Sequence, residues 1–282
     1  MEVVGSASEL RVRLSPSRGR LVGFVPTMGA LHEGHLSLVA RARRQDEVVV
    51  VSIFVNPLQF SQGEDFERYP RPLERDLALL RDAGVDVVFT PRAGDLTPAE
   101  AATSVRVRGL TERLEGASRP GHFEGVATIV AKLFNLVAPA RAYFGEKDFQ
   151  QLAVVRRMVR DLDFAVEVVG CPIVREPDGL AMSSRNAYLS PRDRGRALAL
   201  SSALLEAARD WTGDVEATRT RLRTTLGSAP GVRLDYAEVV DPETLEPLEG
   251  VVGTPAHALV AAFLGATRLI DNIRLEHDAA DG

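Results

Sequence analysis

The sequence has little cysteine and no long apolar run. Its single cysteine, Cys171, excludes an internal disulfide and a cysteine metal cluster, and its position in the apolar run Val166–Val174 favours a core residue over a reactive thiol. No apolar run approaches the roughly 20 residues of a membrane span. The first residues, MEVVGSASELRVRL, lack the apolar segment of a secretory signal. We therefore expect a cytoplasmic protein without a membrane partner.

The sequence also lacks a basic excess. It has 34 Lys and Arg against 39 Asp and Glu, which gives a formal net charge of −5. Proteins that bind nucleic acid usually carry a strongly basic face, so we expect no nucleic-acid partner, although local basic pockets for phosphate are still possible. The 282 residues, of which 45% are hydrophobic and 26% charged, are typical of a soluble globular protein with one large domain or two smaller ones.

Most of the chain alternates β-rich runs with helical patterns. The run Val48–Val55, VVVVSIFV, is typical of a strand that is buried on both faces, as in a parallel sheet covered by helices. This alternation predicts an α/β fold with a Rossmann-like, doubly wound parallel sheet. The other expected strands are Leu21–Pro26, Val85–Thr90, Arg141–Phe144 and Val166–Ile173, and the expected helices are Gly34–Arg44, Pro72–Ala83, Gly125–Leu136 and Phe149–Leu162.

The pattern changes after Pro177. Two helical segments, Pro191–Asp210 and Val215–Leu226, precede three β-like runs. Helices followed by consecutive strands predict a smaller α+β domain with an antiparallel sheet. The three runs are Val232–Val240, Ala258–Leu264 and Arg268–Leu275, and the boundary is expected near Arg175–Gly179, giving domains of residues 1–175 and 176–282.

The most informative stretch is VPTMGALHEGH, in which an apolar strand runs through a turn into a helix near Gly34. Ligands collect at the carboxyl ends of strands in an open parallel sheet, and a helix N-terminus there offers N–H groups and partial positive charge to phosphate. His32 and His35 could donate hydrogen bonds to phosphate oxygens. They are three residues apart, so this is not the zinc-protease motif HExxH, and no P-loop motif is present. A structural role for each histidine is the alternative.

Three further segments carry polar groups suited to phosphate or acid recognition. The loop Met182–Asn186 joins Ser hydroxyls to an Arg that can bind two oxygens at once, although an ordinary loop is the alternative. Asn56 and Gln59 follow a buried strand, where their amides can donate and accept, although Asn-Pro is also a common turn. In the segment Gly145–Asp148, Lys147 can meet a phosphate and Asp148 can cap a helix.

Together these motifs resemble the HIGH-type nucleotidyltransferase superfamily and, within it, the pantothenate synthetases. The matching strings are PTMGALHEGH, SIFVNPLQF, RPGHFEGV, FGEKDFQQL and MSSRNAYLS, which follow one another in the family's order. The resemblance implies a ligase that condenses pantoate with β-alanine through a pantoyl adenylate, with ATP as co-substrate and Mg²⁺ as cofactor. It also implies a homodimer, in which residues 1–175 bind nucleotide and pantoate and residues 176–282 act as a lid.

The resemblance also assigns roles to individual residues. His35 (as proton donor), Lys147 and Arg185 are the implied catalytic residues, Gln59 and Gln151 bind pantoate, and Gln59 also binds β-alanine. The implied ATP contacts are Met28, Gly29, Ala30, Leu31, His32, Glu33, Gly34, His35, Gly145, Glu146, Lys147, Asp148, Val174, Met182, Ser183, Ser184 and Arg185.

Other assignments are less specific. Asp76 is a candidate for positioning magnesium, with a solvated helix face as the alternative. His122, in RPGHFEGV, is expected to be structural or to lie at the rim of the site. The polar segment Ser61–Arg71 is expected to help close the site over the adenylate. Three other functions stay open: a zinc-dependent hydrolase that uses His32 and His35, a non-catalytic nucleotide sensor, and a synthetase for another small acid.

Overall fold

A computed structural model describes residues 1–17, 19–61 and 63–276 of the chain. The chain divides into two compact units, each described by itself. The first comprises Met1–Glu146 and Gln150–Pro172, and the second comprises Lys147–Phe149 and the residues from Ile173 onward.

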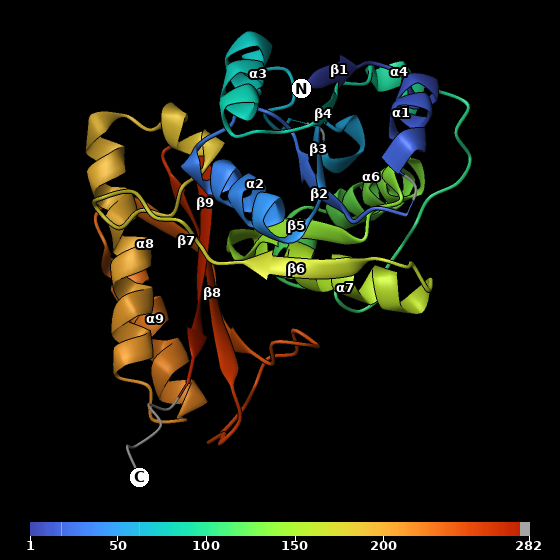
Figure 1. Ribbon diagram of the computed structural model, residues 1–282. Coiled ribbons are helices and arrows are strands. Elements are labelled where there is room, and N and C mark those ends of the chain that lie inside the picture. Colours follow the sequence, from blue (N-terminus) through green and yellow to red (C-terminus); the bar gives the residue numbers. More distant parts are fainter. Residues whose placement is uncertain (18, 62, 277–282) are drawn as a thin grey trace. The chain divides into compact units, whose positions relative to one another are not determined.

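The first unit is built on a six-stranded parallel sheet (Figure 1). The strand order is β1-β4-β3-β2-β5-β6. The strands are β1 (Glu2–Val4), β2 (Val22–Thr27), β3 (Val48–Ile53), β4 (Val87–Phe89), β5 (Arg141–Gly145) and β6 (Glu167–Cys171). The chain runs outward from β2 in one direction and from β5 in the other, so these two neighbours form the topological switch point. Ligands of doubly wound sheets bind at the carboxyl ends of such strands.

Helices cover both faces of this sheet. On one face, Val25 of β2 belongs to a core with Leu38 and Ala42 of α2. On the other face, the ring of Phe134 in α6 lies 6.5 Å from the ring of its β2 partner, Phe24. Adjacent residues of β2 therefore face opposite helical layers, as the alternation along a strand requires. The helices are α1 (Ala7–Leu14), α2 (Glu33–Gln45), α3 (Leu73–Asp82), α4 (Ala93–Leu96), α5 (Glu115–Ser118), α6 (His122–Val137) and α7 (Phe149–Asp161), with 3₁₀ turns η1 (Ser15–Ser17), η2 (Pro57–Gln59) and η3 (Glu146–Asp148).

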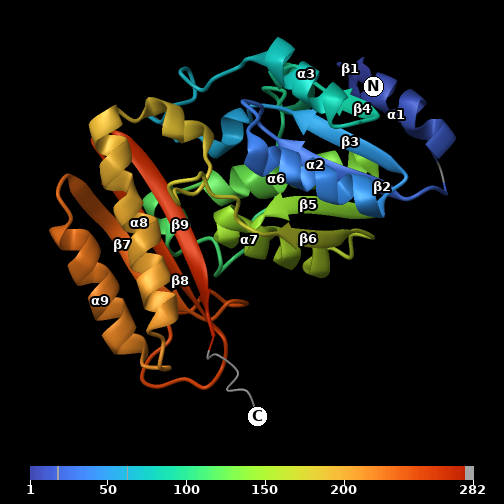
Figure 2. The same cartoon turned by 60° about the vertical axis from the view of Figure 1, so that its left-hand side comes forward.

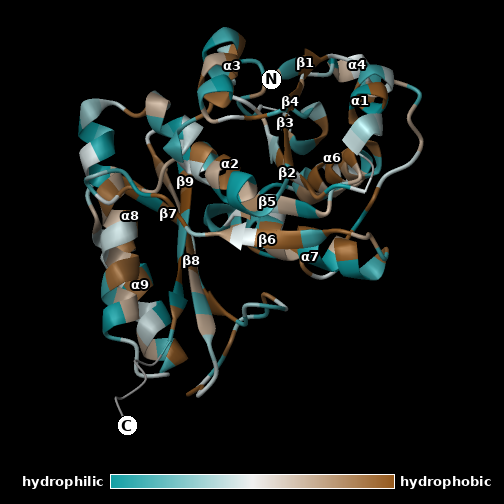
Figure 3. Cartoon of the chain, viewed as in Figure 1, coloured by the Kyte–Doolittle hydropathy of each residue, from teal (hydrophilic) through white to brown (hydrophobic). Residues whose placement is uncertain are grey.

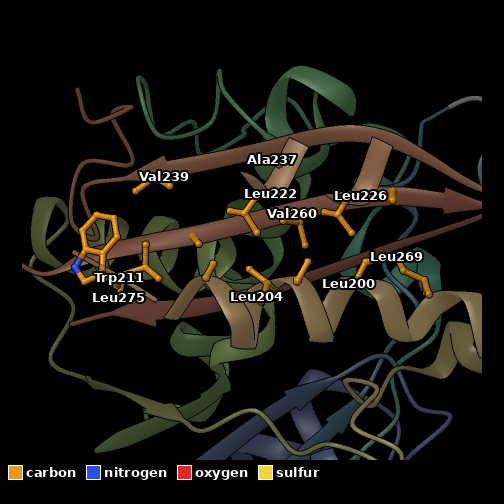
Figure 4. Close-up of a cluster of buried hydrophobic side chains, with 14 of the residues drawn as sticks. Leu200, Leu204, Trp211, Leu222, Leu226, Ala237, Val239, Val260, Leu269 and Leu275 are labelled. Carbon is orange, nitrogen blue, oxygen red and sulfur yellow. The ribbon is translucent and has the colours of Figure 1, made fainter. Parts of the chain in front are cut away.

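The second unit is a three-stranded antiparallel sheet with two long helices against one face (Figure 2). Its strands lie in the order β7 (Val232–Val240), β8 (Ala256–Leu264), β9 (Thr267–Leu275), and its helices are η4 (Ser184–Tyr188), α8 (Pro191–Arg209) and α9 (Val215–Ser228). Leu200, Leu204, Leu222, Leu226 and Val260 are among the side chains that form its core (Figure 4). Hydrophobic and hydrophilic residues alternate around α8 and α9 (Figure 3), which is the pattern expected of helices with one buried face.

The predicted fold class is confirmed by this arrangement of a parallel and a smaller antiparallel sheet. The expected helix at Gly125 begins three residues earlier, at His122, because Gly121 adopts a φ of +83° and starts it there. The short elements β1 and α1 were not predicted. None of the helices in the described part of the chain has the length and apolar character that a membrane span requires.

Candidate active site

The turn after β2 is held by a buried carboxylate. Gly29 and Ala30 have φ angles of +83° and +50°, a left-handed conformation that is unfavourable for alanine. Asp76 of α3 accepts hydrogen bonds from the backbone N–H of Ala30 at 2.8 Å and of Leu31 at 2.9 Å. The hydroxyl of Thr27 accepts from the N–H of Gly29 at 3.1 Å. The backbone of this glycine-containing turn is thus fixed at three successive amides.

Asp76 does not have one of its two predicted roles, that of a residue on a solvated helix face. It is 1% exposed, so a solvated helix face is wrong. Each of its carboxylate oxygens already accepts a backbone hydrogen bond, which leaves limited capacity for a cation. In the part of the chain that the structure describes, no group of three or more His, Cys, Asp or Glu side chains is arranged to hold a metal ion. These residues do not fit a preformed magnesium site, nor the zinc site of the hydrolase alternative.

His32 and His35 lie together at the start of α2. Their ring centroids are 4.0 Å apart, and the backbone N–H of His32 donates to Nδ1 of His35 at 3.4 Å. Because that nitrogen accepts, the neutral ring of His35 carries its proton on Nε2. The helix begins at Glu33, one residue before the expected start. His35 can therefore offer an N–H donor beside a helix N-terminus.

Gln59 lies against the turn that follows β2. Its amide Nε2 is 3.0 Å from the sulfur of Met28, and its Oε1 accepts from Nδ2 of Asn56 at 3.1 Å. Asn56 is 2% exposed, caps η2 by accepting from the N–H of Leu58, and donates to the carbonyl of Gly125. The structure thus brings two predicted groups together, and the turn role of Asn56 holds alongside its contact with Gln59.

The main chain of Gln59 is held by residues that were not predicted to do so. Its carbonyl accepts from Nδ1 of His122 at 2.8 Å and from the Arg119 guanidinium at 3.2 Å. The same guanidinium forms two 2.7 Å hydrogen bonds to the carboxylate of Glu64 and a 3.2 Å hydrogen bond to Nε2 of His122. His122 therefore has the structural role that was expected. The string RPGHFEGV contained the signal for Arg119 and His122, whereas no sequence signal pointed to Glu64.

Burial and the neighbouring Arg119 charge lower the pKa of His122 to about 4. The hydrogen bonds agree, because the guanidinium can only donate, so Nε2 of His122 must accept and its single proton resides on Nδ1. A neutral His122 is thus the form that holds Gln59 near pH 7.

Close backbone packing brings η2 against α6. A Cβ atom added at Gly125 would overlap the carbonyl of Leu58, directly before Gln59. Glycine is therefore required at this position for η2 to lie where it does.

The segment after β5 contains two adjacent glutamines with different roles. Gln150 is 2% exposed, and its amide donates to the carbonyls of Leu110 at 2.7 Å and Arg113 at 2.8 Å and accepts from the N–H of Glu115 at 3.0 Å. That fully bonded amide is structural. Gln151, the predicted pantoate residue, is half-buried in the first turn of α7. Gly145 and Glu146 lie where β5 ends and η3 begins.

In the second unit, Lys147 is held by its backbone. Its carbonyl accepts from Nδ2 of Asn272 at 2.9 Å, and its ammonium lies 3.4 Å from the carboxylate of Asp148. Phe149 stacks on His257 with ring centroids 3.7 Å apart and planes at 9°. The Lys147 ammonium is therefore carried on a short 3₁₀ turn that is anchored at the Lys147 carbonyl and at Phe149, which follows the turn.

The predicted serine-rich loop is also ordered by short-range contacts. The N–H of Met182 donates to the carbonyl of Val174 at 3.0 Å, which brings two predicted ATP residues together. Ser183 caps η4 by accepting from the N–H of Arg185, which places Ser184 in the first turn. The amide of Asn186 donates to the carbonyl of Ala181 at 3.1 Å. The loop is thus a strand-like hairpin that ends in a capped turn.

Comparisons with known proteins show to which family the chain is similar. Residues 2–274 match the family model described as pantoate-beta-alanine ligase. The chain is 57% identical over 279 residues to a pantothenate synthetase of Thermus thermophilus, with 98% of this chain and 99% of that one covered. It is 56% identical over 284 residues to a pantothenate synthetase of Acidobacterium capsulatum, with 97% and 94% covered.

Solved structures give the same result. The crystal structure of a pantothenate synthetase from Thermus thermophilus superposes with a TM-score of 0.92 at 54% identity, covering 98% of this chain and 100% of that chain. A pantoate-beta-alanine ligase from Francisella tularensis, complexed with beta-gamma ATP and beta-alanine, gives a TM-score of 0.81 at 34% identity, covering 97% of each chain.

Proposed function

Because the chain belongs to the pantoate-beta-alanine ligase family, we infer that it catalyses the ATP-dependent condensation of pantoate with β-alanine to give pantothenate, AMP and pyrophosphate. The observation that carries the residue assignment is the contact between Gln59 and Met28. It joins a side chain suited to a hydroxy acid to the turn suited to phosphate, both at the carboxyl ends of neighbouring strands.

The first step activates the acid. A pantoate carboxylate oxygen attacks the α-phosphorus of ATP, the bond from that phosphorus to the bridging oxygen breaks, and pyrophosphate leaves. The product is a pantoyl adenylate. A free carboxylate is a poor acyl donor because oxide would have to leave, whereas the adenylate releases AMP. The protein's task is to align the reactants and stabilise phosphate charge.

Three side chains are proposed to meet that charge. The Nε2–H of His35 donates to a phosphate oxygen as pyrophosphate leaves, a role supported by the hydrogen bond that reserves Nδ1 as an acceptor. Lys147 places a positive charge at the α-phosphate. Arg185 binds phosphate oxygens with two parallel N–H groups from the first turn of η4. The remaining proposed ATP contacts are Met28, Gly29, Ala30, Leu31, His32, Glu33, Gly34, Gly145, Glu146, Asp148, Val174, Met182, Ser183 and Ser184.

Two glutamines are proposed to hold the acid. The Gln59 amide is oriented by Asn56 and its carbonyl by His122, so its position is set before substrate arrives. Gln151 is the second pantoate contact. In the second step, the amine of β-alanine attacks the activated acyl carbon, AMP leaves with the electron pair of the carbon–oxygen bond, and the nitrogen loses a proton. Gln59 is proposed to contact β-alanine as well.

Magnesium is proposed to arrive as part of Mg-ATP. Mg²⁺ at nucleotide sites commonly keeps several waters and binds substrate phosphates together with few protein groups. The buried Asp76 carboxylate fits the role of fixing the phosphate-binding turn better than that of a direct ligand. The expected role of Asp76 in helping to position magnesium, through waters, stays a prediction.

Several broader assignments also stay predictions. These are a homodimer, a cytoplasmic location, nucleotide and pantoate binding by residues 1–175, and lid roles for residues 176–282 and the segment Ser61–Arg71. Light scattering on the purified chain tests whether it forms a homodimer. Proteolysis of the segment Ser61–Arg71 with and without pantoate plus ATP tests its lid role, and equal sensitivity would contradict it.

Pantoate-dependent exchange of pyrophosphate into ATP tests the function directly. We expect exchange with pantoate and little with the same acid lacking its hydroxyls. Exchange with another small acid but not with pantoate would establish a different synthetase, and nucleotide binding without exchange would favour the sensor alternative. Lys147→Ala should lower the exchange rate roughly 100- to 1000-fold, the usual cost of removing a group that stabilises transition-state charge.

A further inference from the structure

We propose that Asp271 and Asn272, adjacent on β9, are positioning residues that hold both ATP-contacting segments of the second unit. The inference rests on the proposed function, since it concerns how Lys147 and the loop Met182–Arg185 are kept in place. Neither Asp271 nor Asn272 belongs to a sequence motif that suggested a role.

Asn272 acts on the turn that carries Lys147. It is 3% exposed, and its Nδ2 donates to the carbonyl of Lys147 at 2.9 Å. A carbonyl can only accept, so the amide nitrogen must face it, and Oδ1 must point the other way. There it lies 2.8 Å from Nε2 of His257, which therefore donates. Both ends of the buried amide are satisfied, and its orientation is fixed.

His257 braces the same turn through a second contact. Its ring stacks on Phe149, two residues after Lys147. Burial lowers the pKa of His257 to about 4, so the ring is neutral near pH 7. The turn is thus held at a backbone carbonyl on one side and at an aromatic ring on the other, and both contacts lead to one buried asparagine–histidine pair.

Asp271 acts on the loop that carries Arg185. It is 4% exposed, and its carboxylate accepts two hydrogen bonds from the guanidinium of Arg175, at 2.7 Å and 3.1 Å. Arg175 forms a β-bridge with Ala181, and its guanidinium also donates to the carbonyl of Gly179. The bidentate ion pair therefore fixes both arms of the hairpin that leads into Met182.

The two positioning residues share a rigid support. Successive side chains of a strand point to opposite faces, so Asp271 and Asn272 reach in opposite directions from one backbone segment. The Asp271 carboxylate also accepts from the N–H of Asn272 at 2.8 Å. Because β9 is paired with β8 along its whole length, it sets the spacing between the two segments. A misplacement of about 1 Å at such a site can cost roughly 100-fold in rate.

Isosteric variants test this arrangement. Asn272→Asp keeps the acceptor for His257 but replaces the donor to Lys147 with a second oxygen. Asp271→Asn keeps the shape but removes the charge that binds Arg175. The matched control is Glu249→Gln, which makes the same carboxylate-to-amide change at an exposed residue of the same unit. For each variant, pantoate-dependent exchange gives kcat and the KM values for ATP and pantoate, and hydrogen exchange measures the local order of residues 145–149 and 174–186.

Asn272→Asp should lower kcat roughly 10- to 100-fold with little change in the KM for pantoate, and should speed hydrogen exchange in residues 145–149. Asp271→Asn should raise the KM for ATP and speed exchange in residues 174–186. On a Lys147→Ala background, Asn272→Asp should have almost no further effect on the rate, because it acts through that lysine.

The proposal is overturned if both variants match Glu249→Gln in rate and in hydrogen exchange. It is also overturned if the rate losses caused by Asn272→Asp and Lys147→Ala multiply in full in the double variant, or if Lys147→Ala leaves the rate unchanged. Failure of the wild-type protein to catalyse pantoate-dependent exchange would instead refute the proposed function. The hydrogen-exchange measurement needs no activity, so it still decides whether the two residues order these segments.

Discussion

Asp76 and Ala30 are 46 positions apart in the chain, and a 2.8 Å hydrogen bond joins the carboxylate of the first to the backbone N–H of the second. Ala30 has a φ of +50°, which costs an alanine free energy relative to an ordinary conformation. A buried carboxylate that accepts from this amide and from Leu31 can offset that cost. The turn proposed to receive phosphate is thus held before substrate binds.

Asp76→Asn should loosen this turn. One of the two backbone N–H groups would then face an amide N–H instead of an oxygen, so we expect a loss of about 2–3 kcal/mol in the free energy of unfolding. The KM for ATP should rise at least roughly tenfold, in line with about 1.4 kcal/mol of lost positioning. Chemical denaturation and exchange kinetics measure the two effects.

A magnesium titration separates this role from metal binding. If Asp76 were a direct ligand, excess Mg²⁺ would restore much of the activity of Asp76→Asn, whereas a turn-holding role predicts no rescue. Asp82→Asn, on the exposed side of the same helix, is the control and should behave like the wild type.

Gly125→Ala should impair the recognition of pantoate. The added methyl group would overlap the carbonyl of Leu58 and push η2, with Gln59, away from α6. We expect a rise of roughly tenfold or more in the KM for pantoate and a smaller change for ATP, since a displaced side chain loses its substrate contact. In the control Gly195→Ala, on α8, the methyl group meets open space and should be neutral or stabilise the helix by about 1 kcal/mol. Equal KM values for the two variants would contradict the role of this close contact.

Tyr143→Phe should affect stability alone. The Tyr143 hydroxyl donates to the fully buried carboxylate of Asp46, whose other oxygen accepts from Arg141 at 2.9 Å. Burial, followed by the hydrogen bond to Asp46, raises the pKa of Tyr143, so the hydroxyl remains a donor. Its loss should cost about 1–3 kcal/mol in the free energy of unfolding. Asp46 precedes β3, away from the carboxyl strand ends, so kcat and KM should not change. A kinetic defect without a loss of stability would contradict this assignment.

Much of the fold follows from local pattern, because buried parallel strands and amphipathic helices each leave a periodic signal. VVVVSIFV became β3 at its expected start, Val48. The first helix, α1, was missed although Ser6 and Glu9 form a capping box at its start, because its eight residues are too few for a clear helical period. The strand β1 has only three residues, too few for a period to be visible.

The candidate site likewise has contacts that the sequence could predict and contacts that it could not. Residues at the ends of neighbouring strands, such as Met28 and Gln59, could be predicted to meet, because topology brings strand ends together. Contacts between residues far apart in sequence could not. Arg119 and Glu64 are 55 positions apart, and Arg175 and Asp271 are 96 apart. Such pairings depend on how whole elements pack, and a single sequence carries no signal for them.

The stability of the protein should fall on acidification through the titration of His122. Its pKa in the folded state, about 4, lies below its ordinary value of 6.5, so the unfolded chain binds more protons between these values. The stabilisation is therefore complete above pH 6.5 and is lost as the pH falls toward 4. The variant His122→Asn can keep the donor to the Gln59 carbonyl, but its amide does not titrate. Between roughly pH 7 and 4, the free energy of unfolding should therefore fall in both proteins, and by about 1–3 kcal/mol less in the variant than in the wild type. His257 titrates in both proteins and cancels in the comparison. If the plots of unfolding free energy against pH were parallel for the two proteins, His122 would be protonated in the folded state without loss of its contacts.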